Sequence, residues 1–391
     1  MKGVLAIYTG EDLKPYGTIQ SALPFKSRDG SDMKKPGRPM LPTDKVRFVG
    51  DPIACVVAET VLQAKDAAEA IELDIEPLPV VVDFTKADAK GAPAVFDDIP
   101  DNVSLDYHYG DTEKVSAAFA GAAHKVKLKM LNSRLVVNSM EPRSAIGEYD
   151  KAKDSYTLHS VSQGVMGMKA GVTAAMKTTP DKVHIRTGNV GGSFGMKAPV
   201  YPEYVCIMHA AKMLGRPVKW TDERSGSFMS DSHGRDHEQT AELALDAEGH
   251  FLALRINGYG NLGGFQSQMG PQAPTLNTVR NSISLYQTPL MEVNTKCVFT
   301  NTTQLAPYRG AGRPEAVFIV ERLFDAAARK IGMDPRAIRK ANYIKPAQLP
   351  YTNAAGQVYD SGAFAHMLDR AVKLADWDGF AARKKAAKKK S

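Results

Sequence analysis

Cysteine is scarce in this chain, with three residues among 391, Cys55, Cys206 and Cys297. They lie far apart in apolar runs, and none has the CxxC or Cys/His spacing of an iron–sulfur or zinc site. We therefore expect buried free thiols and no metal bound directly by protein side chains. Free thiols are typical of a reducing compartment, which predicts a cytoplasmic protein.

Long apolar runs are also absent. No stretch approaches the roughly 20 apolar residues that a membrane-spanning helix needs. The N-terminus shows neither the apolar core nor the cleavage site of a signal peptide. We expect no membrane span. The hydrophobic content of 43% nevertheless predicts a folded chain with two or three domains.

Outside one segment, the chain has little net charge. The formal charge is +7, and the stretch from Arg383 to Lys390 alone holds six lysines and arginines. This stretch has no aromatic residue on which a nucleic-acid base could stack. We interpret residues 376–391 as a basic, solvated tail and expect no nucleic-acid partner. A non-enzymatic, basic-tailed binding protein stays open as one alternative.

The sequence does contain strand-like and helix-like patterns in alternation, which predicts an α+β fold. A first domain is expected over residues 1–90, with Thr60 capping its helix. The segment 21–42 is rich in Pro, Gly, Ser and Lys and predicts an exposed loop. Expected elements are a strand and helix start over 3–13, strands or strand-like pieces over 46–49, 53–58, 73–79 and 80–82, and a helix over 61–71.

A turn-rich segment, 91–115, is expected to link this domain to a second one over residues 116–375. The second domain shows strand patterns, helix patterns and one hairpin. Its expected strands are 126–137, 156–162, 183–186 and 218–220, its hairpin is 240–256, and its helices are 164–176, 203–214 and 318–331, with a further helix start at Asp334-Pro335.

Two glycine-containing loops are the most informative motifs. Gly191-Gly-Ser-Phe-Gly-Met-Lys197 follows the strand at 183–186, and Ala306-Pro-Tyr-Arg-Gly-Ala-Gly-Arg313 precedes the last long helix. Glycine lets a ligand approach the backbone closely, and free N–H groups in such a loop bind anions. The first loop has neither GxGxxG nor P-loop spacing, which excludes those nucleotide sites. A tight turn without ligand and an anionic cofactor held by backbone amides both stay open.

The residues around both loops resemble the molybdopterin-binding large subunit of the xanthine dehydrogenase, aldehyde oxidase and carbon monoxide dehydrogenase family. The resemblance runs from Gly3 to about Phe380. It implies an α/β hammerhead domain, N-terminally incomplete, over residues 1–90, and the first molybdopterin-binding α+β domain over 116–375. The matching segments are Val46–Ala58, Glu76–Val80, Met140–Arg143, Gly188–Tyr204, Gly215–Ser225, Ala306–Glu315 and Gly332–Asn342.

This resemblance implies part of a molybdenum hydroxylase. In such enzymes a molybdenum–molybdopterin cofactor, expected here in its cytosine dinucleotide form, inserts water-derived oxygen into a C–H bond. Electrons then leave through Fe–S clusters and FAD on partner subunits. Gln163 matches a glutamine that hydrogen-bonds an oxygen ligand of molybdenum. Gly191, Gly192, Ser193, Phe194 and Gly195 match the loop along the cofactor, and Tyr308, Arg309 and Gly310 match the substrate-facing loop. Gln163, Phe194 and Arg309 are the candidate catalytic residues.

Two departures from the family pattern narrow the expected substrate. Gly310 stands where copper-containing carbon monoxide dehydrogenases have a cysteine, which disfavours carbon monoxide. Ala198 stands where xanthine dehydrogenases have a glutamate, which disfavours purines. An aldehyde or an N-heteroaromatic ring is therefore the expected small-molecule substrate.

The catalytic glutamate of the family lies in a C-terminal half beyond this chain, and we interpret Glu141 as structural. The resemblance implies three partners: that C-terminal half, a 2Fe–2S subunit and an FAD subunit. The alternative is a truncated, inactive fragment.

Overall fold

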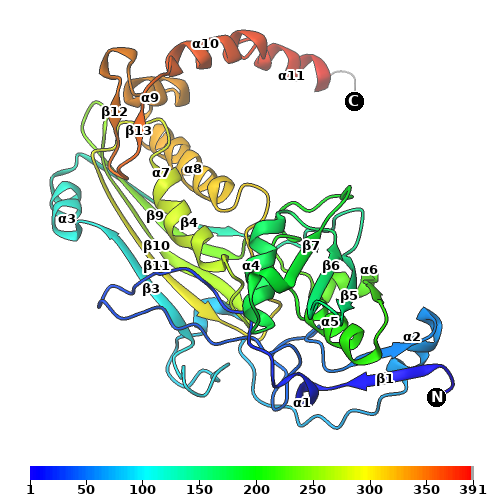
Figure 1. Cartoon of the computed structure of the whole chain (residues 1–391). Helices are drawn as coiled ribbons and strands as arrows, with labels where there is room; N and C mark the ends of the chain where they lie inside the picture. Colours follow the sequence, from blue (N-terminus) through cyan, green and yellow to red (C-terminus); the bar gives the residue numbers. More distant parts are fainter. Residues whose placement is uncertain (389–391) are drawn as a thin grey trace.

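The computed structural model describes residues 1–388. Two sheets of different size lie at opposite ends of an elongated molecule (Figure 1). The smaller one has four strands in the order β7-β6-β5-β8, and the larger has five in the order β3-β11-β10-β9-β4. The α+β class predicted from the sequence is confirmed.

The N-terminal segment forms a two-stranded antiparallel sheet beside the four-stranded one. The predicted cap at the start of α2 is confirmed. The Gln63 N–H donates to the Thr60 hydroxyl oxygen at 3.3 Å, and the Thr60 N–H donates to the Gln63 side-chain oxygen at 3.2 Å. The elements are β1 (Val4–Tyr8), α1 (Gly10–Leu13), β2 (Cys55–Ala58), α2 (Val61–Glu69) and a short 3-10 turn η1 (Phe84–Lys86).

Three expectations for this region are wrong. Residues 46–49 and 73–82 form no strand, because no neighbouring strand pairs with them and Pro77 and Pro79 have no N–H to donate. The segment 21–42 is irregular as expected but is not simply exposed. Met33, Met40 and Leu41 are at most 3% exposed, since their apolar side chains pack into the cores of the molecule.

The four-stranded sheet packs one face against α4 and α5. Leu158, Met168 and Val205 are completely buried in that layer. Helix α5 begins with Pro202 at its first turn and ends at Gly215, whose φ of 66° terminates the helix. The elements are β5 (Ser144–Asp150), β6 (Ser155–Ser160), α4 (Val165–Ala175), η2 (Pro180–Lys182), β7 (Val183–Arg186), α5 (Pro202–Leu214), β8 (Val218–Thr221) and α6 (Arg224–Ser230).

The five-stranded sheet packs against α7, α8 and α9. Leu323 and Phe324 of α8 are among the buried side chains of this layer, as the apolar stripe in the sequence predicted. The elements are β3 (Val103–Gly110), α3 (Thr112–Gly121), β4 (His124–Asn132), β9 (His237–Leu245), β10 (Phe251–Gly263), η3 (Gly270–Gln272), the π-helical η4 (Ala273–Asn277), α7 (Thr278–Ser282), β11 (Leu290–Phe299), α8 (Arg313–Ile331) and α9 (Pro335–Asn342).

The segment expected to be a linker, 91–115, is largely structured. Val95, Phe96 and Ile99 are buried in a core cluster together with Phe265 and Phe299. Strand β3 pairs with β11, and α3 begins at Thr112. The apolar side chains of this segment thus belong to the larger sheet, although the domain limits themselves stay a prediction.

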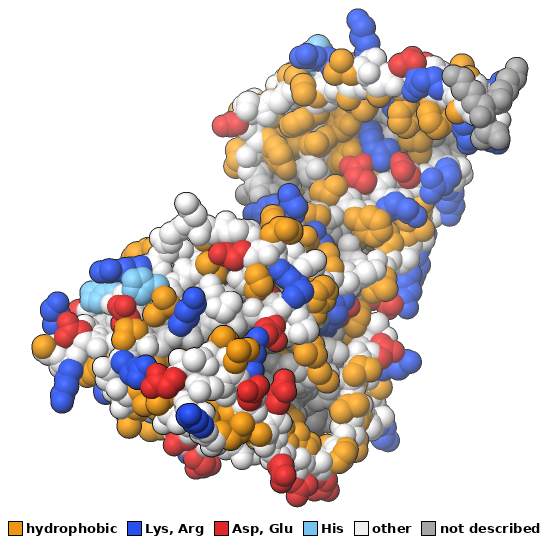
Figure 2. Space-filling model, turned by 90° about the vertical axis from the view of Figure 1, so that its right-hand side faces the viewer, with side chains coloured by type: hydrophobic (Ala, Val, Ile, Leu, Met, Phe, Trp, Pro, Cys, Tyr) orange, Lys and Arg blue, Asp and Glu red, His pale blue; other side chains and the backbone are white. Residues whose placement is uncertain are grey.

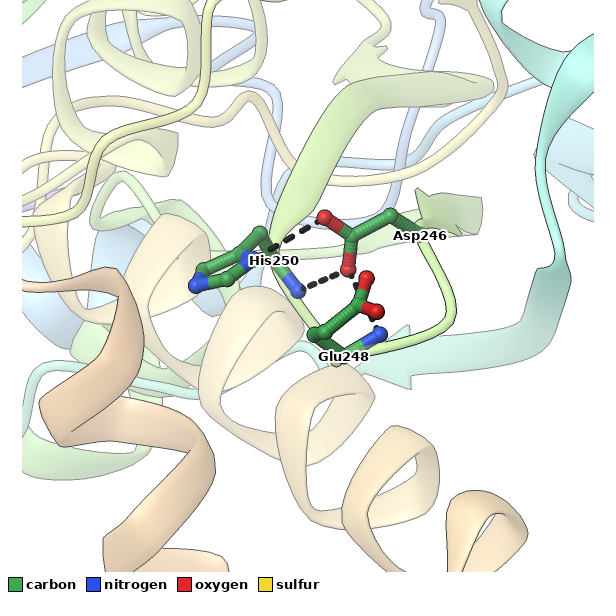
Figure 3. Close-up of side chains that lie close together, drawn as sticks. All are labelled: Asp246, Glu248 and His250. Atoms are coloured by element: carbon green, nitrogen blue, oxygen red, sulfur yellow. Dashed lines mark hydrogen bonds and ion pairs between the residues drawn. The ribbon is translucent and has the colours of Figure 1, made fainter.

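The turn of the predicted hairpin brings together Asp246, Glu248 and His250 (Figure 3). The Asp246 carboxylate accepts backbone N–H bonds from Glu248 and His250, at 3.0 and 2.7 Å, and contacts the His250 ring at 2.9 Å. These bonds close the turn between β9 and β10. The cluster is therefore explained by turn formation.

The described C-terminal part ends in a pair of helices, α10 and α11, that project above α9 (Figure 1). No residue of either helix is buried. The end of the expected solvated tail, 389–391, lies outside the described residues, but Phe380–Lys388 is helical. None of the helices in the part of the chain described here has the length and apolar character that crossing a bilayer requires. The last elements are η5 (Pro346–Gln348), β12 (Tyr351–Thr352), β13 (Val358–Tyr359), α10 (Phe364–Leu374) and α11 (Phe380–Lys388).

Candidate functional site

Gln163 and the first glycine loop lie together at the carboxyl ends of the parallel strands β6 and β7. The Gln163 Oε1 atom accepts two hydrogen bonds, from Ser193 Oγ at 2.5 Å and from the Gly195 N–H at 2.7 Å. The Gln163 N–H in turn donates to the Lys197 carbonyl at 3.2 Å. The structure thus brings the predicted glutamine into direct contact with the predicted loop.

The loop backbone has the conformations that its glycines allow. Gly192 and Gly195 have φ values of 99° and 108°, and Phe194 between them has a φ of 52°, unusual for a bulky residue. A β-carbon on Gly195 would lie 2.2 Å from the Pro307 carbonyl oxygen. Gly195 is therefore required both by its backbone angle and by the close approach of the second loop.

The second loop meets the first through Arg309 and Phe194. The Arg309 N–H donates to the Phe194 carbonyl at 2.8 Å, and the Arg309 guanidinium lies 5.0 Å from the centre of the Phe194 ring. The Phe194 ring is 40% exposed although it is large and apolar. The two side chains therefore form one exposed surface beside Gln163.

Tyr308 and Gly310, the neighbours of Arg309 in the second loop, pack against residues other than Phe194. Tyr308 packs against Gly234, and the Arg235 guanidinium lies 5.0 Å from its ring centre. Gly310 has a φ of 96°, and a β-carbon there would lie 2.5 Å from Pro314. Both residues fix the shape of the second loop through these contacts.

An ion pair between a buried lysine and a half-buried glutamate, which the sequence did not predict, holds the first loop in place. Lys197 is fully buried, and its Nζ donates to Glu141 Oε2 at 2.8 Å. The same oxygen accepts the Gly191 N–H at 2.7 Å. Burial acts to raise the pKa of Glu141, but the bonds from Lys197 and Gly191 outweigh it and lower the pKa. In the sequence, the lysine at the end of the glycine motif was the one residue that could have indicated this pair.

A second buried charge cluster centres on Arg143, two residues after Glu141. Its completely buried guanidinium contacts the carboxylates of Asp231 and Glu203, and it lies 3.8 Å from the Tyr201 ring centre. Burial acts to lower the pKa of Arg143, but Glu203 and the other acidic groups raise it well above its usual value. Arg143 therefore stays charged and connects β5 to α5 and α6.

Comparison with known proteins identifies the family of the chain. A family model described as the molybdopterin cofactor-binding domain matches residues 95–343, and the a/b hammerhead domain of aldehyde oxidase and xanthine dehydrogenase matches residues 1–79. The fold is thus that of a molybdopterin cofactor-binding domain preceded by an a/b hammerhead domain. The chain belongs to the family of molybdenum hydroxylase large subunits, and the predicted family and fold are confirmed.

Three relatives show the range of the similarity. The carbon monoxide dehydrogenase large chain of Hydrogenophaga pseudoflava is 31% identical over 99% of this chain and 49% of its own length. The nicotinate dehydrogenase large molybdopterin subunit of Eubacterium barkeri is 30% identical over 87% of this chain and 77% of its own. The crystal structure of quinoline 2-oxidoreductase from Pseudomonas putida 86 has a TM-score of 0.91 and 26% identity, and the match covers all of this chain and 49% of that one. The chain thus spans about half the length of the first and third of these relatives.

Proposed function

We propose that this chain is part of the molybdenum-cofactor subunit of a molybdenum hydroxylase that oxidises an aldehyde or an N-heteroaromatic C–H bond with water-derived oxygen. Electrons would pass to partner subunits that carry 2Fe–2S clusters and FAD. The observation that carries the proposal is the convergence of Gln163, the first glycine loop and Arg309, which come from three separate parts of the chain.

The side-chain amide of Gln163 fits a cofactor ligand above the loop. Its oxygen is used by Ser193 and Gly195, which fixes the amide plane. Its NH₂ group has no hydrogen-bonding partner among the described residues, so it is free to donate to a bound group. We assign Gln163 this donor role, and Gly191, Gly192 and Ser193 the backbone and hydroxyl contacts along the cofactor.

Phe194 and Arg309 are assigned to the substrate side. The exposed Phe194 ring offers a wall against which a flat substrate can pack, and it holds the Arg309 guanidinium by a cation–π contact. The guanidinium forms no ion pair within the described residues, so it can bind a carbonyl or carboxylate of a substrate. Tyr308 and Gly310 shape the loop that carries it.

The molybdenum–pterin cofactor, proposed in its cytosine dinucleotide form, would supply the two-electron oxidation and the oxygen transfer. This chain would supply the contacts from Gln163 and the first glycine loop that bind the cofactor, and no thiolate ligand. The described residues offer no general base at this place, because Glu141 is held by Lys197 and the Gly191 N–H. We therefore place the base in a complementary half of the cofactor site, outside this chain.

The proposed substrate class follows from two side chains that are absent in or beside the two loops. Gly310 offers no thiolate to bind copper, which argues against carbon monoxide, and Ala198 offers no carboxylate for a purine. Two relatives named after nicotinate and quinoline support an N-heteroaromatic ring beside an aldehyde.

A complementary half is proposed as the first partner. The Eubacterium barkeri relative supports this, because a molybdopterin subunit of which this match covers 77% is not much longer than the present chain. The test is to co-express the chain with an adjacent reading frame that encodes the missing half and to analyse the purified complex for metal. Molybdenum in the complex supports the proposal, and a metal-free complex refutes it in favour of an inactive fragment.

The remaining alternative is a non-enzymatic protein that acts through its basic tail. Only the charge of residues 383–390 supports it. Salt-sensitive nucleic-acid binding in a filter assay that disappears when residues 383–391 are deleted would favour this alternative.

The three free cysteines, two of them buried, support the proposal of a reducing, cytoplasmic location.

A further inference from the structure

Two of the three cysteines lie at the contact between the N-terminal two-stranded sheet and helix α5. Cys55 is the first residue of β2, and Cys206 lies in the first half of α5. About 150 residues separate them in the sequence, so only the fold brings them together. Cys55 is partly exposed, whereas Cys206 is buried. The two thiols therefore differ in their access to solvent.

The strand register places the Cys55 side chain on the side of its sheet that faces α5. Tyr8 of β1 is directly opposite Cys55, and opposite residues of an antiparallel pair project to the same side. The centre of the Tyr8 ring lies 4.7 Å from the centre of the His209 ring. His209 is three residues after Cys206, so both lie on one face of α5. Cys55 accordingly packs against the apolar cluster that contains Cys206.

The two thiols interact directly through a hydrogen bond in which the Cys206 S–H donates to the Cys55 sulfur. This bond lowers the pKa of Cys55, although burial and the nearby Glu203 carboxylate act to raise it. The same bond, together with burial, raises the pKa of Cys206 well above its usual value. The thiolate is the reactive form of cysteine, so Cys55 is the more reactive of the two. A reactive, accessible thiol beside a second thiol is the arrangement found at cysteines that oxidise reversibly.

We propose that Cys55 and Cys206 form a site of reversible oxidation, at which hydrogen peroxide converts the two thiols into an intramolecular disulfide. The Cys55 thiolate attacks one oxygen of the peroxide, and the O–O bond breaks. Cys55 becomes a sulfenic acid, and the released hydroxide takes up the proton that Cys55 had lost.

The second step forms the disulfide. The Cys206 sulfur attacks the Cys55 sulfur, the S–O bond breaks, and the hydroxyl group leaves with the Cys206 proton as a second water. The two thiols together lose two electrons, which the peroxide accepts. A dithiol reductant reverses the reaction by thiol–disulfide exchange.

The disulfide would connect the N-terminal two-stranded sheet covalently to α5, the helix that follows the first glycine loop. A cross-link between residues this far apart in the sequence removes conformational freedom mainly from the unfolded chain. The oxidised chain should therefore unfold at a higher temperature than the reduced chain. This inference does not depend on the proposed function, because the reaction involves neither the molybdenum cofactor nor a partner subunit.

The test is to treat the purified full chain with a small excess of hydrogen peroxide and to map its cysteines by mass spectrometry. We expect a cross-linked pair of peptides that contain Cys55 and Cys206, and dithiothreitol should restore both free thiols. The melting temperature should rise by at least about 3 °C on oxidation. Free thiols at both positions, dimers linked through Cys55 or an unchanged melting temperature would contradict the inference.

Three variants test the role of each cysteine. Cys55→Ser should form no intramolecular disulfide, whereas Cys297→Ser, which removes the completely buried third thiol, should form it as the wild type does. In Cys206→Ala the sulfenic acid on Cys55 has no second thiol to react with, so dimedone should trap it.

The same reagent tests the order of the two steps. Dimedone attached to Cys206 in the Cys55→Ser variant would show that Cys206 is attacked first, against the proposal. Circular dichroism checks that each variant is folded. Because Cys55→Ser changes a partly exposed residue, this variant still decides the question if Cys206→Ala does not fold.

Discussion

The side chain of Gln163 joins two segments that are 30 residues apart in the sequence. Its oxygen is enclosed by donors from Ser193 and Gly195, whereas its NH₂ group has no partner in the described part of the chain. An amide that is fixed on one side and free on the other is suited to orienting a ligand. Phe194 and Arg309 extend the same exposed surface.

Replacing Gln163 with alanine should weaken both the loop and the binding of the cofactor. Two hydrogen bonds are lost, each worth about 0.5–1.5 kcal/mol, so the free energy of unfolding should fall by about 1–3 kcal/mol. Urea denaturation measures this change, and metal analysis of the co-expressed complex measures the second effect. Gln357→Ala, whose side chain forms no hydrogen bond in the described structure, is the control. Equal effects of the two substitutions would contradict the role of Gln163.

Gly195→Ala should displace the second loop. The added methyl group would lie 2.2 Å from the Pro307 carbonyl oxygen, at a φ of 108° that alanine rarely adopts. We expect a loss of about 2 kcal/mol or more in the free energy of unfolding. Gly188→Ala, where a β-carbon meets open space, should cost much less. Thermal unfolding of both variants compares the two positions directly.

The Glu141–Lys197 pair should make loop stability depend on pH. The pKa of Glu141 is lower in the folded state than in the unfolded chain, so its contribution is present above the unfolded value of about 4.3 and is lost as the pH falls through the folded pKa. Glu141→Gln should therefore lower stability at pH 7 and reduce the loss of stability between pH 5 and 3. Urea denaturation across this range measures both, and an unchanged acid profile would argue against the pair.

Among the helices and strands, the sequence predicted best those elements whose signals lie within the element itself. The helix capped by Thr60, the helix between Pro202 and Gly215 and the apolar stripe of α8 all follow from residues within one element. The sequence did not predict the strands β3, β5 and β11, because these segments become strands only by pairing with segments far away in the sequence. The strand-like residues 73–82 have the pattern of a strand, but no strand of the described structure pairs with them.

The candidate site was predictable only in part for the same reason. The glycine motifs indicated both loops, whereas the family resemblance identified Gln163 and supplied the roles of all these residues. The contact of Arg309 with Phe194 and the support of the loop by Lys197 required the fold, because more than 50 residues separate the partners. Long-range contacts of this kind leave no periodic signal.

Arg143 should be the most sensitive position between β5, α5 and α6. Arg143→Leu leaves the carboxylates of Glu203, Asp222 and Asp231 without their buried cation. Loss of one partner of a buried charge cluster typically costs about 3–5 kcal/mol. Arg216→Leu breaks an exposed ion pair with Glu59 and should cost at most about 1 kcal/mol. Chemical denaturation of both variants tests the difference, and similar losses would contradict it.

At the scale of the whole molecule, one end of the chain leaves apolar surface uncovered. Met367, Leu374, Trp377 and Phe380 on and beside α10 are between 55% and 84% exposed. Figure 2 shows hydrophobic side chains gathered at this end. An amphipathic helix that buries none of its residues is stabilised weakly by itself.

Helices α10 and α11 should therefore exchange their amide hydrogens quickly in the isolated chain. Binding of the complementary half should slow exchange in residues 364–388 if that half covers their apolar face. Hydrogen exchange with mass spectrometry measures this, with the buried strand β10 as the internal reference. Strong protection of both helices in the isolated chain would show that no covering partner is needed.

The central claim is that Gln163 and the two loops form one half of a molybdenum-cofactor site. The most direct measurement is the molybdenum content of the complex formed with the complementary half, determined for the wild type and for Gln163→Ala. We predict about one molybdenum per chain in the wild-type complex and a clearly lower content in the variant. A stable complex that contains no molybdenum would contradict the account.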